Sequence, residues 1–414
     1  MIRKTGSVML ALAFLTAFTL HLLLFSYSPM IPTVITEMRI SHAEAGLIFS
    51  MSVLAIIALR IPWGFLSDRL GVKTTMKLAM AFVGAFSLLR GFSPNYWTLL
   101  ASQLLLGVGF AAILPCLAKI VSLMFEEKAG LATGIYASGF PIGELVGLGL
   151  ASNLLLGLRG DWRMVFKIFG AWSLVLAVLW WRVDRKPQVA VMSARSTTKI
   201  RDLIGMKQVW ILTGLCIGSM GCYDTLLAWF PRILELQGIP AMEASIIASI
   251  FPVGFLLSGT VVGSLSDRAG LRKPFIWILG LSSAVLIVLT PRLGGPSLWG
   301  AMLLTGFTLS GILALVLAML AEDSDLSGFV GSAVGLVSSV GNIGSFLLPI
   351  IVGFLIDVTG SSAPPMTALA IVSGSTVILS IATRETGRAS VRQRPIGNGR
   401  EGIKKSNAQT PAQR

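Results

Sequence analysis

Runs of about 20 apolar residues recur along the whole chain, and they limit its fold more than any other feature of the sequence. Each run is long enough to cross the hydrocarbon core of a bilayer, which is about 30 Å thick. Hydrophobic residues make up 54% of the 414 residues and charged residues only 13%, more apolar surface than a soluble fold of this size can bury. The sequence therefore predicts an all-α membrane protein with twelve transmembrane helices. We place these helices at 8–28, 45–66, 76–93, 97–121, 130–155, 162–181, 207–230, 243–265, 274–291, 297–320, 328–356 and 364–383.

The basic residues predict how the helices are oriented. The 33 Lys and Arg residues, which give the chain a net charge of +14, are concentrated in short segments that flank the apolar runs. The segments that they dominate, including 182–206 and the tail from Arg384, fall on one side of an even number of spans. Basic loops are retained in the cytoplasm. We therefore expect both termini to be cytoplasmic in an inner or plasma membrane, with Arg90 near the opposite surface. This distribution favours contact with membrane lipid and argues against nucleic acid as a partner.

An internal repeat divides the chain. When the sequence is shifted by 199 residues, 32–73 aligns with 231–272 without a gap, and Glu44 meets Glu243. An even number of crossings separates the copies, so they have the same orientation. This pattern predicts two pseudo-symmetric six-helix bundles with a substrate site at their interface, near the midplane. We assign 1–181 to the N-terminal bundle, 182–206 to a cytoplasmic basic linker, 207–383 to the C-terminal bundle and 384–414 to a disordered basic cytoplasmic tail.

The loops after the second and eighth runs both read G-x-L-S-D-R-x-G-x-[KR]. Glycine permits a tight turn at the membrane surface, and the Asp-Arg pair can bridge neighbouring helix ends. With both copies present, the chain resembles the major facilitator superfamily over its whole length. The resemblance implies a secondary transporter, acting as a monomer, in which the motif steadies one access state and governs the conformational switch. The residues that carry this gating role are Gly64, Asp68, Arg69, Gly71, Gly263, Asp267, Arg268 and Gly270.

Two branches of that superfamily share local patterns with the chain. The stretch 59–64, which contains Arg60, and the glycine-rich stretch 341–344 resemble the nitrate/nitrite porter branch, where an arginine in the second helix binds the anion. The matching position of the second half is Gly259, so no paired arginine exists there. The stretch from Tyr223 to Pro231 is similar to the cyanate-transporter-like branch. These resemblances imply that the substrate is an anion.

Ionisable residues inside the apolar runs need a reason, because each costs about 2.5–3.5 kcal/mol on insertion scales. Arg60 can bind an anion or a carboxylate, reach the cytoplasmic surface, or pair with Glu144. Glu144, near the middle of the fifth run, can carry a coupling proton, bind a cation or neutralise Arg60. Asp224 and His21 are further candidates for proton or ion coupling, although Asp224 can also reach outer water and His21 can be a packing residue.

Uncharged residues inside the runs suggest substrate contacts and helix packing. The candidate polar contacts of the substrate, besides Arg60, are Tyr27, Tyr136, Tyr223 and Asn342. Gly139, Gly143 and Gly147, spaced four residues apart, form a stripe of small residues along one face of the fifth helix. Such stripes allow two helix backbones to approach closely, and we expect this packing role here.

Motifs of other membrane-protein classes are missing. No Gly-Lys dipeptide occurs, so the chain has no phosphate-binding loop of an ATP-driven pump. No H-E-x-x-H, C-x-x-C or G-x-S-x-G occurs either, so we expect no enzyme activity, no metal and no cofactor. The sequence is thus interpreted as a secondary active transporter of a small anionic solute, with the coupling ion, a proton or another, left open. The alternative is a proton-driven exporter of lipophilic cations or drugs, in which Glu144 and Asp224 face the substrate and Arg60 is structural.

Overall fold

The computed structural model of the chain describes residues 2–125, 128–182, 203–326 and 330–387. The first half comprises α1 (Ile2–Phe25), η1 (Ser28–Met30), α2 (Ile31–Met38), α3 (His42–Leu70), α4 (Val72–Arg90), α5 (Tyr96–Met124), α6 (Ala129–Ala137), α7 (Gly139–Gly157) and α8 (Trp162–Arg182). The second half comprises α10 (Lys207–Glu235), α11 (Ala241–Ala248), α12 (Phe251–Ala269), α13 (Lys273–Leu289), η3 (Thr290–Arg292), α14 (Gly295–Glu322), η4 (Ser324–Leu326), α15 (Val330–Thr359) and α16 (Ala363–Ala382).

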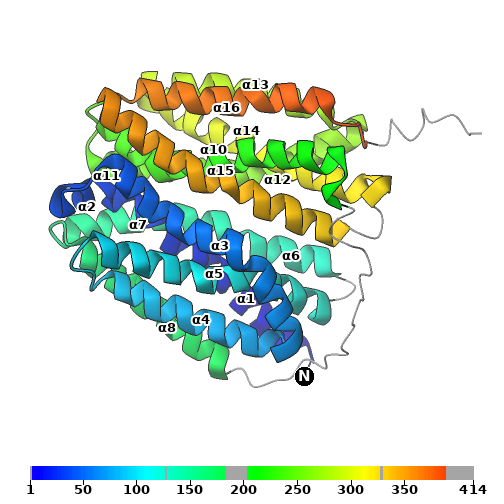
Figure 1. The fold of residues 1–414 in the computed structure, drawn as a ribbon, viewed down its shortest axis with the longest axis horizontal. Coiled ribbons are helices and arrows are strands. Elements are labelled where there is room, and N and C mark those ends of the chain that lie inside the picture. Colours follow the sequence, from blue (N-terminus) through cyan, green and yellow to red (C-terminus); the bar gives the residue numbers. More distant parts are fainter. Residues whose placement is uncertain (1, 126–127, 183–202, 327–329, 388–414) are drawn as a thin grey trace, which may run out of the picture.

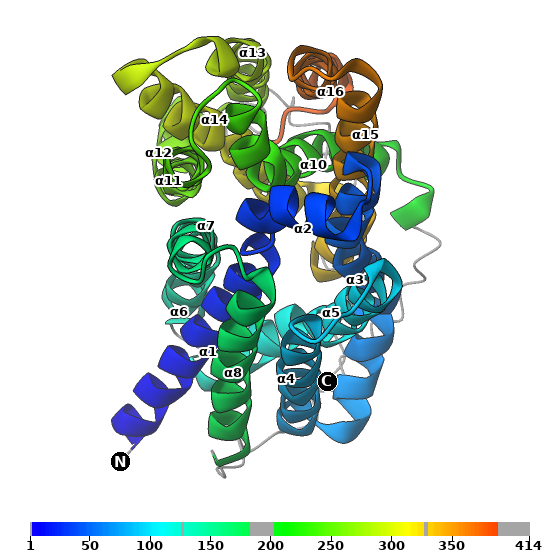
Figure 2. The ribbon, with the colours of Figure 1, turned by 90° about the vertical axis from the view of Figure 1, so that its left-hand side faces the viewer.

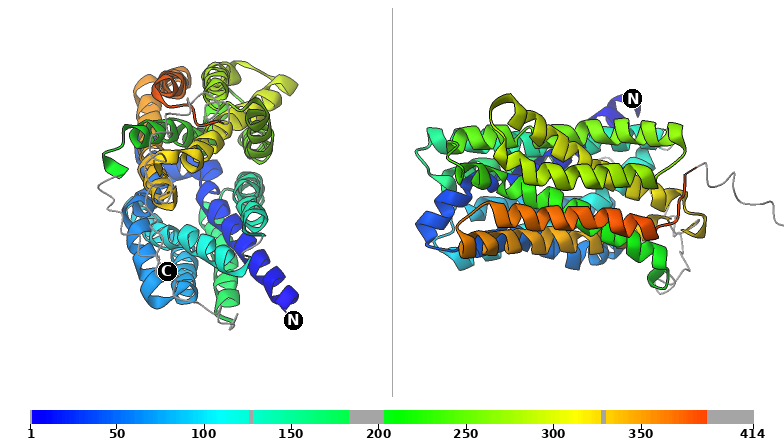
Figure 3. Two further views of the ribbon diagram at one scale, coloured as in Figure 1. Left: turned by 90° about the vertical axis from the view of Figure 1, so that its right-hand side faces the viewer. Right: turned by 90° about the horizontal axis from the view of Figure 1, so that it is seen from above.

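Within these described residues, twelve helical spans are long and apolar enough to cross a membrane, which confirms the predicted all-α architecture. Figure 1 shows the helices of the first half in the lower part of the molecule and those of the second half in the upper part. The same separation is visible from the end of the bundle in the left view of Figure 3. Most of the segment assigned as the linker, 183–202, and most of the assigned tail, 388–414, lie outside the described residues.

Three spans are broken at positions that the apolar runs alone did not reveal. The first span continues from α1 through η1 and α2 as far as Met38. The fifth span is divided into α6 and α7 at Ser138, and the eighth into α11 and α12. Proline explains these breaks, because it is accepted in the first turn of a helix but interrupts a helix interior. Pro29, Pro141 and Pro252 stand in the first turns of η1, α7 and α12, respectively.

The sequence repeat extends to the packing of the helices. A Cβ atom added to Gly107 of α5 would collide with the carbonyl oxygen of Ser52 of α3. A Cβ atom added to Gly306 of α14 would collide with the carbonyl oxygen of Phe251 of α12. Both members of the second pair lie 199 residues after those of the first. The two halves therefore reproduce the same close helix contact at equivalent positions.

The two ends of the bundle are distinguished by the residues that they hold. We call the end that holds Gly71 and Gly270 the motif end, and the end that holds His42 and Asp357 the far end. Gly71 and Gly270 have φ angles of 83° and 67°, left-handed values that glycine adopts without strain. The start of α1 and the end of α16 both lie at the motif end, on the right in Figure 1. Figure 2 looks onto the far end, where α2 and α11 lie.

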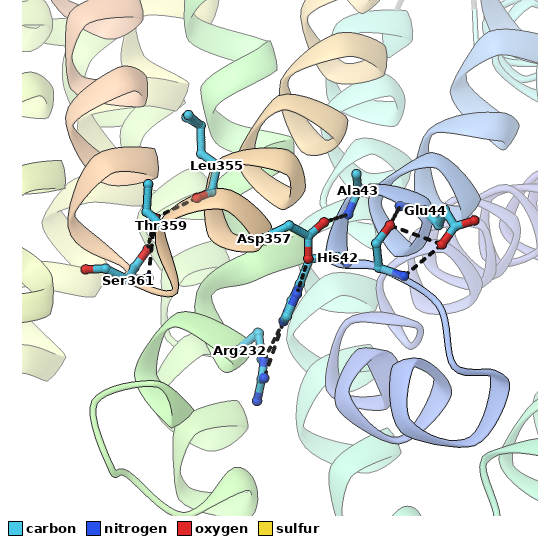
Figure 4. A network of polar contacts seen from close by, with 9 residues as sticks. His42, Ala43, Glu44, Arg232, Leu355, Asp357, Thr359 and Ser361 are labelled. Atoms are coloured by element: carbon cyan, nitrogen blue, oxygen red, sulfur yellow. Dashed lines mark hydrogen bonds and ion pairs between the residues drawn. The ribbon is translucent and has the colours of Figure 1, made fainter.

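At the far end, a carboxylate of the second half caps a helix of the first half (Figure 4). Asp357 Oδ1 accepts the backbone N–H of His42 at 2.9 Å, and Oδ2 accepts that of Ala43 at 2.9 Å. The His42 ring joins the contact, since its Nδ1 lies 2.7 Å from Asp357 Oδ1 and its Nε2 accepts from Arg232 Nε at 3.3 Å. An acid at a helix N-terminus is favourable because it satisfies free N–H groups and opposes the helix dipole. We call His42, Arg232 and Asp357 the far-end latch.

Two further contacts join the halves on the same side of the midplane. Ser28 Oγ donates to the carbonyl oxygen of Ala228 at 2.5 Å. Gly46 of α3 lies directly against the backbone of Pro349 of α15, where a Cβ atom would collide with the carbonyl oxygen. The far-end parts of the two halves are thus joined by close backbone packing as well as by the far-end latch.

Candidate functional site

A cavity of about 200 Å³ lies between the two halves. Eleven of its lining residues come from the first half and eight from the second. Glu144 and Asn342, which line it from opposite halves, both stand near the middle of their spans. A second cavity, of about 270 Å³, lies at the motif end, but residues of the second half alone line it. The interface cavity therefore fits the position predicted from the repeat, and we take it as the candidate site.

The glycine stripe of the fifth span brings α7 against α1. Cβ atoms at Gly143 and Gly139 would collide with the carbonyl oxygens of Phe18 and Phe14, and one at Gly147 would lie 3.0 Å from the carbonyl oxygen of Leu22. The expected packing role of the stripe is confirmed. Since the two backbones touch, polar side chains on these helices can meet over a short distance.

His21 and Glu144 meet in this way. Nδ1 of His21 lies 2.6 Å from Oε1 of Glu144, although 123 residues separate them in the sequence. The Phe140 ring covers the imidazole, with ring centroids 4.6 Å apart. Only 2% of the Glu144 side chain is exposed, against 23% of that of His21. The pair thus forms a nearly buried polar centre that opens to the cavity through the histidine.

The second oxygen of Glu144 binds across the interface. The hydroxyl of Tyr223, on α10 of the second half, donates to Oε2 at 2.6 Å. One carboxylate therefore connects α1 and α7 of the first half with α10 of the second. Tyr223 and Glu144, which the sequence suggested for substrate binding and coupling separately, are brought together by the fold.

Arg60 lines the same cavity from α3 but has a different environment. Its Nε is buried, and among the described residues it has no hydrogen-bond partner. In this described part of the chain, no carboxylate forms an ion pair with Arg60, and both oxygens of Glu144 are bound to other groups. The Arg60–Glu144 pair, one of the three arrangements expected for Arg60, is not formed in this structure.

The remaining cavity residues of polar character come from the second half. Asp224, Asn342 and Ser310 line the cavity from α10, α15 and α14. Asn342 Nδ2 donates to the carbonyl oxygen of Ser338 at 2.8 Å, so its amide oxygen is left for other partners. Ser310 Oγ donates to the carbonyl oxygen of Gly306 at 2.6 Å. Asp224 is therefore the second carboxyl group of the site, beside Glu144.

Two of the residues proposed as substrate contacts lie elsewhere. Tyr27 is fully buried near the far end, where its hydroxyl donates to the carbonyl oxygen of Ala45 at 3.2 Å. Tyr136, on α6, packs edge to face against Phe140 at 6.3 Å and is not part of the cavity lining. Both rings are large side chains that fill space between helices, which the sequence pattern alone could not separate from a cavity contact.

Arg90 was expected near the membrane surface, and it is the last residue of α4, at the far end. Its side chain is nevertheless 0% exposed inside the first half, which the sequence did not reveal. Its Nη1 donates to the carbonyl oxygen of Leu23 at 3.0 Å and to Gln103 Oε1 at 3.2 Å, and its guanidinium covers the Phe166 ring at 4.3 Å. The available signal was its position within an apolar run, where an arginine has to find partners among neighbouring helices.

The two motif loops are anchored within their own halves. Asp68 Oδ1 pairs with Lys119 Nζ at 2.6 Å in the first copy. In the second copy, Asp267 pairs with Arg272, which also holds Glu322 through Nε at 3.0 Å. The pKa of Arg272 is raised above its ordinary value, chiefly by its hydrogen bonds to Glu322 and with a further contribution from Asp267. The motif arginines, Arg69 and Arg268, are exposed.

The start of the assigned tail is bound to the second motif loop. Glu385 Oε1 accepts the backbone N–H of Arg272 at 2.7 Å, and Oε2 accepts that of Lys273 at 3.0 Å. Glu385 therefore caps the N-terminus of α13 from a distance of more than 100 residues in the sequence. Assigning all of 384–414 to a disordered tail was wrong for Arg384 to Gly387, because this short cap has no local sequence signal.

The comparisons with known proteins match this arrangement of helices and motifs. The family model described as Major Facilitator Superfamily matches residues 13–247 and 233–409. The chain is 25% identical over 363 residues to the uncharacterised transporter YycB of Bacillus subtilis, covering 85% of this chain and 87% of that protein. It is 27% identical over 353 residues to the 3-(3-hydroxy-phenyl)propionate transporter of Escherichia coli K12, covering 82% and 85%. It is 24% identical over 357 residues to the D-galactonate transporter of Escherichia coli O6:H1, covering 77% and 82%.

A solved structure shows the same fold. The crystal structure of the nucleoside transporter NupG superimposes with a TM-score of 0.73 at 16% identity, covering 90% of this chain and 98% of that one. At this identity the likeness concerns the fold alone. Since the family model covers both halves and the structure has twelve membrane-length spans in its described residues, the chain belongs to the major facilitator superfamily, a family of membrane transporters and not of enzymes.

Proposed function

We propose that the protein is a proton-coupled symporter of small organic anions, which Arg60 binds in the interface cavity. The observation that carries this proposal is the position of Arg60. It is a cation in a cavity between the two halves, and among the described residues no carboxylate pairs with it. An unpaired charge at this depth is costly, so a ligand that neutralises it is bound favourably.

The relatives support an organic anion as the cargo. The named relatives transport 3-(3-hydroxy-phenyl)propionate and D-galactonate, both of which are carboxylates at neutral pH. The substrates of the nitrate and cyanate branches, which the sequence resembles locally, are also anions, but they are small inorganic ions. We therefore propose that the substrate is an anion, as the sequence suggested, and that it is an organic acid.

The carboxyl groups of the cavity supply the coupling. Arg60 contributes a positive charge, Glu144 and Asp224 contribute a negative charge each when ionised, and His21 is the remaining titratable group beside Glu144. With both acids ionised and His21 neutral, the cavity carries a net negative charge and repels an anion. When protons occupy the acids, the charge of Arg60 is no longer opposed and an anion is attracted. Proton and anion consequently bind together, as a symporter requires.

The Tyr223–Glu144 hydrogen bond connects this chemistry to the conformational change. Rocking of the halves about the midplane has to lengthen or break the contact, because the two groups belong to different halves. Protonation of Glu144 weakens the acceptor and favours that separation. With the basic residues setting the motif end in the cytoplasm, a proton gradient across the cell membrane would drive uptake by a single chain.

The cation-exporter alternative is less well supported. It requires Glu144 and Asp224 to face a cationic substrate, but both oxygens of Glu144 are already bound, to His21 and Tyr223. It also leaves the cavity-facing Arg60 without a role and with a charge that repels the cargo.

Ligand binding to substituted proteins tests the anion site. The purified chain is screened by thermal shift against 3-(3-hydroxyphenyl)propionate, D-galactonate, nitrate and tetraphenylphosphonium, since a ligand stabilises the folded state that it binds. Arg60→Lys keeps the charge but removes the planar fork that holds a carboxylate at two points. We expect it to abolish stabilisation by the organic anions while the protein without ligand still melts near the wild-type temperature. Undiminished anion binding by Arg60→Lys, or stabilisation by the cation alone, would refute the proposal.

Coupling is tested in proteoliposomes. Glu144→Gln cannot exchange a proton, so we expect it to retain counterflow of the anion and to lose uphill uptake driven by a pH gradient. The double change Arg60→Gln with Glu144→Gln should not recover stability relative to the single changes, since the two groups are not paired. Uphill uptake by Glu144→Gln at the wild-type rate would exclude this residue as the proton carrier.

A further inference from the structure

The wall of the interface cavity is mostly apolar. Twelve of the nineteen lining residues have hydrocarbon or thioether side chains, and they come from both halves. The other seven carry polar groups: His21, Arg60, Glu144, Tyr223, Asp224, Ser310 and Asn342. A ligand in this cavity therefore exchanges water for apolar contacts over most of its surface.

Several of the polar groups are already bound within the protein. Glu144 is held by His21 and Tyr223, and the hydroxyl of Ser310 donates to its own helix. Asn342 donates to its own helix as well. A sugar acid brings a row of hydroxyl groups, each of which loses hydrogen bonds to water on entering and needs a partner in the site. Arg60, the carboxyl group of Asp224 and the amide oxygen of Asn342 keep capacity for a ligand, which gives a partner for one carboxylate but too few partners for such a row.

Aromatic rings border the cavity from the two halves. Phe140 belongs to α7 of the first half, and Phe255 belongs to α12 of the second. Phe255 packs edge to face against Tyr223, with ring centroids 5.5 Å apart, so its orientation is fixed. Such rings favour an aromatic guest through stacked or edge-to-face contacts.

The size of the cavity fits one ring. An apolar protein cavity of about 150 Å³ is known to hold one benzene molecule. At about 200 Å³, this cavity has room for one ring and a short carboxylate arm, in contact with Arg60.

We infer that the transported anion is a monocarboxylate with a single aromatic ring, held by Arg60 at its carboxylate and by Phe140 and Phe255 at its ring. This inference rests on the proposed function, because it assumes that Arg60 binds the carboxylate. It adds a selection between the two kinds of organic acid that the relatives carry: it predicts the aromatic acid and rejects the polyhydroxylated one.

The test compares acids that share a carboxylate and differ in the group attached to it: an aromatic ring, a saturated ring or a polyhydroxylated chain. Separate batches of proteoliposomes that contain the full chain are loaded with 3-phenylpropionate, 3-cyclohexylpropionate or D-galactonate, and counterflow of the same acid in labelled form is measured. Phe140→Leu and Phe255→Leu keep an apolar wall but remove the ring. We expect each substitution to lower the apparent affinity for 3-phenylpropionate about threefold to tenfold. The apparent affinity for 3-cyclohexylpropionate should stay nearly unchanged. Phe82→Leu, on the exposed face of α4, is the matched control and should change neither.

The outcomes separate this inference from the proposed function. Counterflow by D-galactonate with little response to 3-phenylpropionate, abolished by Arg60→Lys, would overturn the inference and leave the anion site intact. Equal loss of both ring compounds in the two Phe variants would also overturn it, because the ring contact would then have no selective role. Insensitivity of every acid to Arg60→Lys would overturn the proposed function together with the inference.

Discussion

Asp357 of the second half binds the first turn of α3 in the first half through the backbone N–H of His42, so a helix of one half is capped by the other. Removing the carboxylate should weaken closure at the far end more than it weakens either half. We expect Asp357→Ala to shift the protein toward conformations that are open there. The measurement is the distance between spin labels at Thr36 of α2 and Glu243 of α11, both exposed, in a background without the three buried native cysteines.

A matched control is available for the latch. Asp161 Oδ1 accepts the backbone N–H of Met164 in the first turn of α8, within the first half. Asp161→Ala removes an acid that caps a helix at the same end of the molecule, and it should leave the distance distribution unchanged. If Asp357→Ala also leaves it unchanged, the latch does not hold the halves together.

The two motif aspartates should differ in their effect on transport. Asp68→Asn breaks the pair with Lys119, so it should impair transport with little loss of folded protein, because Asp68 is exposed and Lys119 is half-buried. Asp267→Asn should be milder, since Arg272 keeps its hydrogen bonds to Glu322. Uptake at equal expression is the measurement. Wild-type uptake by Asp68→Asn would contradict a gating role for the first motif.

The glycine contact between α1 and α7 should be sensitive to a single methyl group. Gly143→Ala forces the helices apart at the carbonyl oxygen of Phe18, and we expect a loss of about 1–3 kcal/mol in stability and weaker proton coupling. Gly149→Ala, on the same helix, is the control, because a Cβ atom there meets nothing within 4 Å. That variant should be neutral or slightly stabilised. Equal melting temperatures for the two variants would contradict the tight contact.

Deletions in the C-terminal segment should have different effects on either side of Gly387. Deleting 388–414, which is rich in Arg, Gly and Pro with few apolar residues, should leave uptake within about twofold. Deleting from Glu385 also removes the cap on α13, and it should lower stability by about 0.5–2 kcal/mol. Uptake and thermal unfolding of the two truncations decide this. Loss of substrate affinity in the shorter deletion would show that the segment has a function in transport.

The spans and the repeat could be predicted because their signals are local. An apolar run marks a membrane helix whatever its neighbours, and the shift of 199 residues compares the sequence with itself. The contacts of the site depend on which helices become neighbours. Nothing in the sequence says that His21 meets Glu144, or that the guanidinium of Arg90 reaches Gln103. Candidate residues were therefore identified by type, but their partners required the fold.

The position of Glu144 has a consequence for efficiency. A gradient-driven carrier loses energy whenever the ion crosses without cargo, and long relays between an ion site and a moving element give such leaks more opportunity. Here the carboxylate that would accept the proton also receives the hydroxyl of Tyr223 from the other half. Proton occupancy and separation of the halves are thereby linked reciprocally at a single contact. The tightness of coupling would then depend on whether this one hydrogen bond is made or broken.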